Sequence, residues 1–145
     1  MPSAPERSDR WTAGDATRRA VLGDGHVDAA AARTNAFDDG FQTFITEGAW
    51  GSVWSRPGLT RRERSLITIA LLAALGHDEE VAMHVRATRN TGASMADVAE
   101  ALMHVAVYAG VPAANSAFRI AKDVYAGLED GKEQDDTKQH GGNHG

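Results

Sequence analysis

Apolar residues recur at helical spacing through the middle of the chain, and glycines interrupt the pattern at several points. This spacing is typical of helices that pack one face on a core. No strand-like alternation of useful length is present in the sequence. The pattern therefore predicts an all-α fold, a compact helical bundle in which short loops make neighbouring helices antiparallel. The expected helices span residues 17–23, 31–54, 60–76, 78–91, 94–110 and 111–128.

Local signals mark the ends of the central helices. Thr60 and Glu63 stand at the spacing of a capping box, and Gly76 is expected to end the helix that they begin. Gly92 should end the next helix, and Pro112 suits a first helical turn. Between these signals, residues 66–75 are apolar on every side, which predicts a central, buried helix.

The two ends of the chain differ in composition from the middle. Residues 1–15 are polar and contain proline and serine, which predicts a flexible N-terminal segment. Residues 128–145 contain almost nothing that could be buried, which predicts a disordered tail. A single domain is therefore expected over residues 16–127.

Composition excludes several classes of protein. The net charge of -5 argues against nucleic-acid binding as the main function, because such proteins usually carry a basic surface. The absence of cysteine excludes thiol redox chemistry and thiolate metal sites. No signal-like segment or membrane-length apolar run occurs, which predicts a cytoplasmic protein without membrane contact. The many alanines and glycines on a continuous apolar surface predict a homo-oligomer.

The stretch from Gly76 to Gly92 holds the most informative polar residues. Glu80 and His84 stand four residues apart at the edge of an apolar stripe, and His77 lies about one helical turn before Glu80. One interpretation is an acid/base pair, in which the glutamate orients the imidazole and raises its pKa. A surface ion pair without chemistry is the plain alternative. A metal site formed by the three residues has no evident fourth ligand, and no metal is predicted.

Arginines and aromatic residues flank this stretch. Arg64 abuts the apolar run, and Arg89 follows His84; either could hold a carboxylate through a bidentate contact. Trp50 and Trp54 are four residues apart and suit a core, an interface or a pocket wall. Tyr108 stands before a turn and could donate a hydrogen bond to a ligand or to backbone.

With these residues in place, the chain resembles the gamma-carboxymuconolactone decarboxylase (4-carboxymuconolactone decarboxylase) family. The matching stretches are "RRAVLGDGHVD", "FQTFITEGAWGSVWSRPGLTRRERSLITIALLAALGHDEE", "HVRATRNTG" and "VAVYAGVPAANSAF". The resemblance implies an alkylhydroperoxidase D-like helical fold that assembles as a homo-oligomer, a trimer or hexamer. It also implies conversion of 4-carboxymuconolactone to 3-oxoadipate enol-lactone and CO2, without a cofactor, in protocatechuate (beta-ketoadipate) catabolism.

The resemblance suggests roles for the residues named above. His84, held by Glu80, would protonate a dienolate formed as CO2 leaves. Arg64 or Arg89 would anchor the retained carboxylate of the substrate. Tyr108, His77 or protonated His84 would stabilise the enolate oxygen. Trp50 and Trp54 would form an apolar wall near the departing carboxylate.

One departure from the wider superfamily narrows the chemistry. Redox members of that superfamily carry a CxxC motif before a histidine, and His77 and Glu80 stand where those cysteines would be if His84 matches that histidine. Peroxide reduction through a disulfide is therefore excluded. Two alternatives stay open: a decarboxylase or isomerase of another small anionic lactone, and a non-catalytic oligomeric binding protein on the same scaffold.

Overall fold

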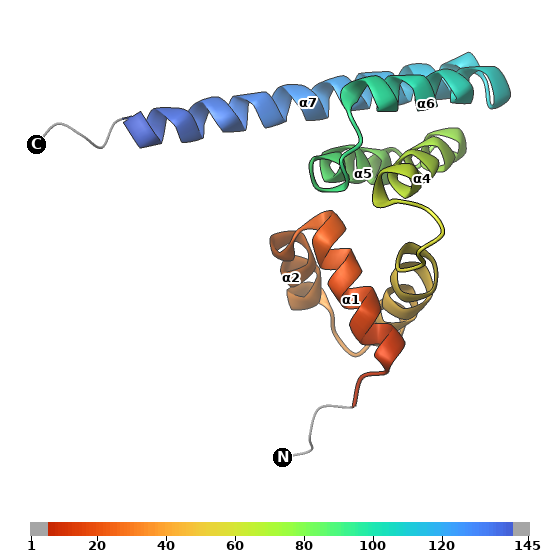
Figure 1. Cartoon of the computed structure of the whole chain (residues 1–145), viewed down its shortest axis with the longest axis vertical. Coiled ribbons are helices and arrows are strands. Elements are labelled where there is room, and N and C mark those ends of the chain that lie inside the picture. Colours follow the sequence, from red (N-terminus) through yellow and green to blue (C-terminus); the bar gives the residue numbers. More distant parts are fainter. Residues whose placement is uncertain (1–5, 141–145) are drawn as a thin grey trace, which may run out of the picture. The chain divides into compact units, whose positions relative to one another are not determined.

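A computed structural model describes residues 6–140 of the chain, with side chains for residues 6–131. All the regular secondary structure of these residues is helical, so the predicted all-α fold is confirmed for the described part of the chain (Figure 1). The helices are α1 (Asp9–Leu22), α2 (Asp24–Arg33), α3 (Asp39–Ile45), the π-helix η1 (Thr46–Trp54), α4 (Arg61–Leu75), α5 (Asp78–Thr91), α6 (Met95–Tyr108) and α7 (Val111–His140).

The chain forms two compact units. The N-terminal unit comprises the chain up to Ser65 together with Ala87–Gly92, and the C-terminal unit comprises Leu66–Arg86 and the chain from Ala93 onwards. The helices α4 and α5 each contribute residues to both units.

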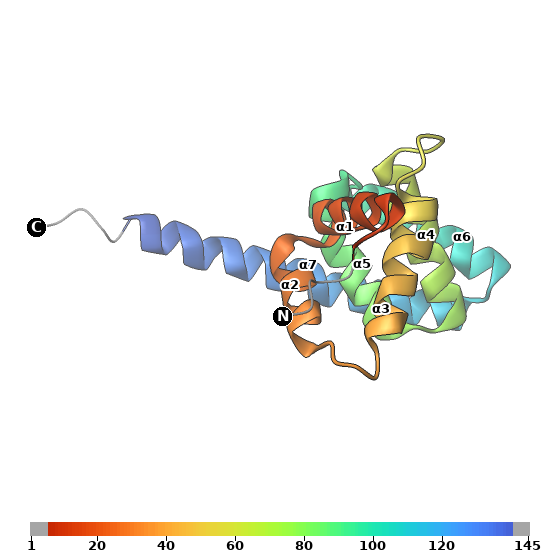
Figure 2. The same ribbon diagram turned by 90° about the horizontal axis from the view of Figure 1, so that it is seen from below.

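In the N-terminal unit, α1 packs against the π-helix η1 (Figure 2). The crossing is close because a glycine stands at the contact on each helix. A Cβ atom at Gly51 would lie 2.5 Å from the Arg10 carbonyl oxygen, and one at Gly14 would collide with the Thr46 carbonyl oxygen. Ser55 continues this contact: its hydroxyl lies 2.8 Å from that of Thr17 and donates to the Trp50 carbonyl at 2.7 Å.

The pattern of residues 31–54 predicts one continuous helix, and the structure corrects this. The helix α2 ends at Arg33, and a turn precedes α3, in which the Asn35 and Asp38 side chains accept backbone hydrogen bonds at 2.9 and 2.8 Å. Asparagine and aspartate favour such local bonds over a continued helix. The chain then widens into η1 over residues 46–54, where the Ser55 N–H donates to the Trp50 carbonyl, five residues back.

The C-terminal unit holds an apolar core to which four helices contribute. Alanines form the contribution of α7, so α6 and α7 can pack closely side by side (Figure 1). The fully enclosed members are Ile69 and Ala73 on α4, Val81 and Val85 on α5, Val98, Leu102 and Val105 on α6, and Ala114, Ala117 and Ala121 on α7.

The prediction that residues 66–75 are buried on every side is wrong for this chain by itself. Ile69 and Ala73 are buried, whereas Ile67, Leu71 and Leu75 are 48%, 58% and 68% exposed. The exposed three are spaced four residues apart and therefore form one stripe along α4. The helix packs on the core with one side only, and its other side is an uncovered apolar surface.

The predicted start of α4 and the predicted ends of α4 and α5 are confirmed. The Glu63 N–H donates to the Thr60 hydroxyl at 3.1 Å, and the Thr60 N–H donates to the Glu63 carboxylate at 3.0 Å. These bonds from the Thr60 backbone and side chain hold the pKa of Glu63 below its ordinary value. Gly76 and Gly92, which follow α4 and α5, have positive φ angles of 75° and 84°, a conformation that glycine adopts without strain.

The outer helices extend further than the composition suggests. The helix α1 begins at Asp9, inside the segment predicted to be flexible, because the Ser8 hydroxyl accepts from the Trp11 N–H at 3.0 Å and caps it. The backbone of α7 is helical as far as His140, beyond the predicted domain end at residue 127. The predicted flexible segment and the predicted tail lie partly outside the described residues, because residues 1–5 and 141–145 are not described. Among the described helices, none is long and apolar enough to cross a membrane.

The close crossing of α1 and η1 gives a first prediction. Gly51→Ala should lower the free energy of unfolding by about 1–3 kcal/mol, because the new methyl group meets backbone atoms that cannot move aside. Gly48→Ala is the matched control, since a Cβ atom there meets nothing within 4 Å. Chemical denaturation followed by circular dichroism would measure both variants. Equal stability of the two variants would contradict the close crossing.

Candidate active site

His84 is the one ionisable side chain that is buried among residues 6–131, with an exposed fraction of 6%. It lies on α5 next to Val85 and one turn after Val81, both of which are in the core of the C-terminal unit. The helix thus carries the imidazole out of water on the border of an apolar face. Ionisable groups held out of water cluster at functional sites, so this position is the strongest candidate for chemistry.

Glu80 and His77 share the N-terminal part of this segment with His84 but lie in a different environment, because both side chains are exposed. His77 precedes α5, and its backbone carbonyl accepts the first hydrogen bond of the helix, from the Val81 N–H at 3.0 Å. Glu80 stands one turn before His84 on the solvent side. The part of the chain with described side chains contains no group of three acidic, histidine or cysteine residues placed to hold a metal ion.

Arg64 is half-buried at the start of α4, in the N-terminal unit. One end of its guanidinium donates to the Arg56 carbonyl at 3.0 Å. Its Nε–H is buried and has no hydrogen-bond partner in the described part of the chain. A buried cationic donor without a partner is the kind of group that a bound carboxylate satisfies. Arg89, the other predicted anchor, is exposed on α5.

The aromatic candidates fall into two environments. Trp50 and Trp54 are stacked in the N-terminal unit with ring centroids 5.0 Å apart, and they are only 6% and 8% exposed. Most of the surface of both rings is therefore packed inside the protein, as in core residues, which is one of the interpretations that the sequence left open. Tyr108 is 86% exposed at the end of α6, where its ring stacks on that of His104 with the ring centroids 6.3 Å apart.

Sequence reasoning missed two features of the N-terminal unit. The π-helix brings Trp50 and Ser55 into an i,i+5 relation that no helical periodicity predicts. Arg18 also has a buried Nε–H without a hydrogen-bond partner in the described residues. The only sequence signal for Arg18 is its position beside Arg19 at the apolar end of α1.

Comparison with known proteins identifies the family to which the chain belongs. The sequence profile of the carboxymuconolactone decarboxylase family matches residues 39–123, more than half of the chain. The chain belongs to the carboxymuconolactone decarboxylase family. This match spans the helices from α3 to α6 and the N-terminal part of α7, and it includes all the candidate residues from Trp50 to Tyr108.

Several curated proteins are similar to this family member. The 4-carboxymuconolactone decarboxylase of Acinetobacter baylyi is 45% identical over 119 residues, which cover 82% of this chain and 89% of that protein. The nitrosuccinic acid decarboxylase of Metarhizium robertsii is 41% identical over 95 residues, 66% of each chain. A 4-carboxymuconolactone decarboxylase of Pseudomonas putida is 46% identical over 46 residues, 32% of this chain and 96% of that sequence.

Proposed function

We propose that this protein decarboxylates 4-carboxymuconolactone to 3-oxoadipate enol-lactone and CO2, in the cytoplasm and without an added cofactor. The observation that carries the proposal is the 45% identity, over most of both chains, to a 4-carboxymuconolactone decarboxylase. The buried imidazole of His84 supports it, because the reaction needs a proton donor in a place from which water is excluded.

The substrate itself supplies the place for the electrons. The bond between the ring and the departing carboxylate breaks, and its electron pair moves through the ring double bond into the lactone carbonyl. CO2 leaves and a dienolate remains. A proton then passes from the protonated His84 imidazole to the ring carbon beside the carbonyl, which gives the enol-lactone, and water restores the imidazolium. Because conjugation holds the electrons, the reaction needs neither pyridoxal phosphate nor thiamine as an electron sink.

The substrate named for the Metarhizium robertsii relative also contains its own electron acceptor. Nitrosuccinic acid carries two carboxyl groups, and its nitro group can accept the electrons that a departing carboxylate leaves. A family that acts on both compounds would therefore need a proton donor and a cation for the retained carboxylate, rather than a cofactor. This relative also favours the alternative that another small dicarboxylate with its own electron sink is the true substrate.

The remaining candidates take supporting roles in the proposal. Glu80 would favour the charged form of His84 through its negative charge. Arg64 would bind the retained carboxylate with its unpaired Nε–H, and Arg89 is the second cation available on the chain. His77 or Tyr108 would donate to the enolate oxygen, and the small exposed edges of Trp50 and Trp54 would contribute apolar surface.

Removal of the imidazole tests the proton donor. His84→Gln, which keeps a polar side chain in the buried position, should lower kcat by about 10²-fold or more while the helical circular dichroism spectrum stays unchanged. Glu80→Gln should lower kcat much less, because this variant keeps the donor. The rate is followed by the loss of ultraviolet absorbance of freshly generated 4-carboxymuconolactone, with CO2 release measured in parallel. An unchanged kcat in His84→Gln would remove His84 from the chemical step.

Arg64 is tested through the balance of KM and kcat. Arg64→Met should raise KM by about tenfold or more with a smaller effect on kcat, because it removes a charged contact made to both the ground state and the transition state. Arg61→Met is the matched control, since Arg61 is an exposed arginine at the start of the same helix. Equal KM values for the two variants would show that Arg64 does not hold the substrate.

We also propose that the protein assembles with copies of itself, as a trimer or hexamer. The support is the uncovered stripe of Ile67, Leu71 and Leu75 on α4, since contiguous exposed apolar surface commonly marks an interface. The exposed Met103 and Val107 lie four residues apart on α6 and extend the apolar surface of the C-terminal unit.

The stripe on α4 provides the test of assembly. Leu71→Glu should shift the protein to a smaller species in size-exclusion chromatography with light scattering, because a buried charge without a partner opposes association. Glu79→Gln, an exposed substitution elsewhere, should leave the mass unchanged. A wild-type protein that runs as a monomer, or an unchanged mass of Leu71→Glu, would contradict this surface as the interface.

A further inference from the structure

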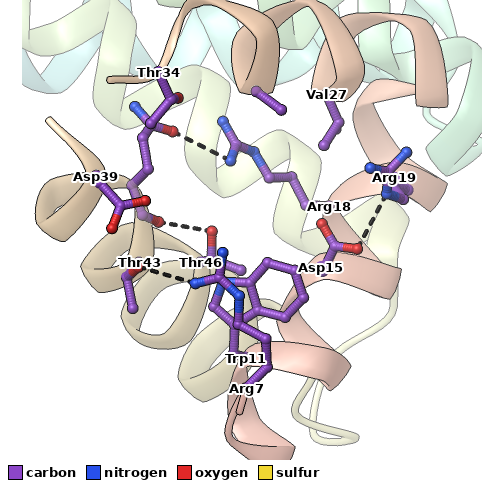
Figure 3. A pocket seen from close by; sticks show the side chains of 12 residues that line it. Arg7, Trp11, Asp15, Arg18, Arg19, Val27, Thr34, Asp39, Thr43 and Thr46 are labelled. Carbon is purple, nitrogen blue, oxygen red and sulfur yellow. Dashed lines mark hydrogen bonds and ion pairs between the residues drawn. The ribbon is translucent and has the colours of Figure 1, made fainter. Parts of the chain in front are cut away.

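The N-terminal unit contains a pocket of about 340 Å³ that no part of the proposed reaction uses. Its walls come from the segment before α1, from α1, α2 and α3, and from the first residue of η1 (Figure 3). Most of its lining precedes residue 39, where the match to the family profile begins. Its volume lies within the range of pockets that hold small molecules, about 300–1,000 Å³.

Arg18 is the central cation of this pocket. Its side chain extends from α1 across the pocket, as Figure 3 shows, and donates to the Gln42 side-chain oxygen at 3.5 Å, a long hydrogen bond. Its Nε–H is buried and has no hydrogen-bond partner in the described part of the chain. Burial lowers the pKa of Arg18, with partial compensation from the charge of Asp15. The guanidinium has thus lost water on one edge without gaining an anion.

The neighbouring charged residues do not neutralise Arg18. Asp15 is 3.1 Å from Arg19, which also binds Asp24 and Asp28 at 3.1 and 2.8 Å. These three carboxylates raise the pKa of Arg19 above its ordinary value and satisfy it. Arg19 is therefore held by three carboxylates, whereas Arg18 does not take part in these ion pairs.

A second cation reaches the same pocket from the opposite side. Arg7 donates to the Thr43 hydroxyl at 3.4 Å, and its guanidinium carbon lies 4.3 Å from the centre of the Trp11 ring. Asp39, the other carboxylate of the lining, is exposed to solvent. The Trp11 ring and the side chains of Val27 and Ala31 give the pocket an apolar part beside its cations.

We propose that this pocket is a binding site for a small organic carboxylate with a flat apolar body. The guanidinium of Arg18, which lines the pocket, offers its terminal N–H groups to the carboxylate oxygens, as arginine does in its pairs with carboxylates. Trp11, Val27 and Ala31 then contact the apolar body. The lining belongs to the N-terminal unit, and the proposal does not depend on the chemistry assigned to His84.

Benzoate is a suitable probe because it joins one carboxylate to a flat ring. Isothermal titration of the full-length protein should detect its binding, and Arg18→Met should weaken the affinity by about tenfold or more. Arg33→Met, the loss of an exposed arginine on α2 outside the lining, should leave the affinity unchanged. His84→Gln should also bind benzoate as the wild type does.

A second variant keeps the test decisive if Arg18→Met does not fold. Ala31→Trp fills the pocket from an exposed position of α2 without touching the guanidinium charge, and it should abolish the same binding. The proposal is overturned if the wild type does not bind benzoate, or if filling the pocket leaves the affinity unchanged. It is also overturned if His84→Gln removes the binding, or if inorganic phosphate binds as tightly as benzoate.

Discussion

The exclusion of water from one imidazole is the constraint around which the C-terminal unit is arranged. To bury His84, α5 must turn Val81 and Val85 into the core, and the alanines of α7 must leave room for the helices to approach. His84 is the one ionisable side chain of residues 6–131 that is buried as a whole, whereas Arg18 and Arg64 are buried only in part.

The parts of the fold that local chemistry determines could be predicted from the sequence. The bounds of α5 and the capping boxes at Thr60 and Ser94 depend on residues within one turn of each other. The π-helix could not be predicted in this way, because its i,i+5 hydrogen bond from the Ser55 N–H to the Trp50 carbonyl follows no local sequence signal. The exposed stripe of α4 was also missed, since a wholly apolar segment does not show which of its sides finds a partner.

The candidate site shows the same division. Spacing indicated correctly that Glu80 and His84 lie on neighbouring positions of one helix. It could not show that one is exposed and the other buried, because positions four apart differ by about 40° around the axis and burial changes steeply at the edge of an apolar face. Arg18 gave even less signal, since its pocket is formed by three separate stretches of the sequence, residues 7–19, 27–34 and 39–46, and nothing near it in the sequence distinguishes it from Arg19.

The close contact of α1 and η1 at Gly14 and Gly51 also bears on other members of the family. Gly14 and Gly51 stand at the one contact where a methyl group on either helix would strike the backbone of the other. Any relative that carries a larger residue at either position must dock its first helix elsewhere or lack that helix. The two positions together are therefore a diagnostic pair, readable from sequence alone, for chains that build their first helix in this way.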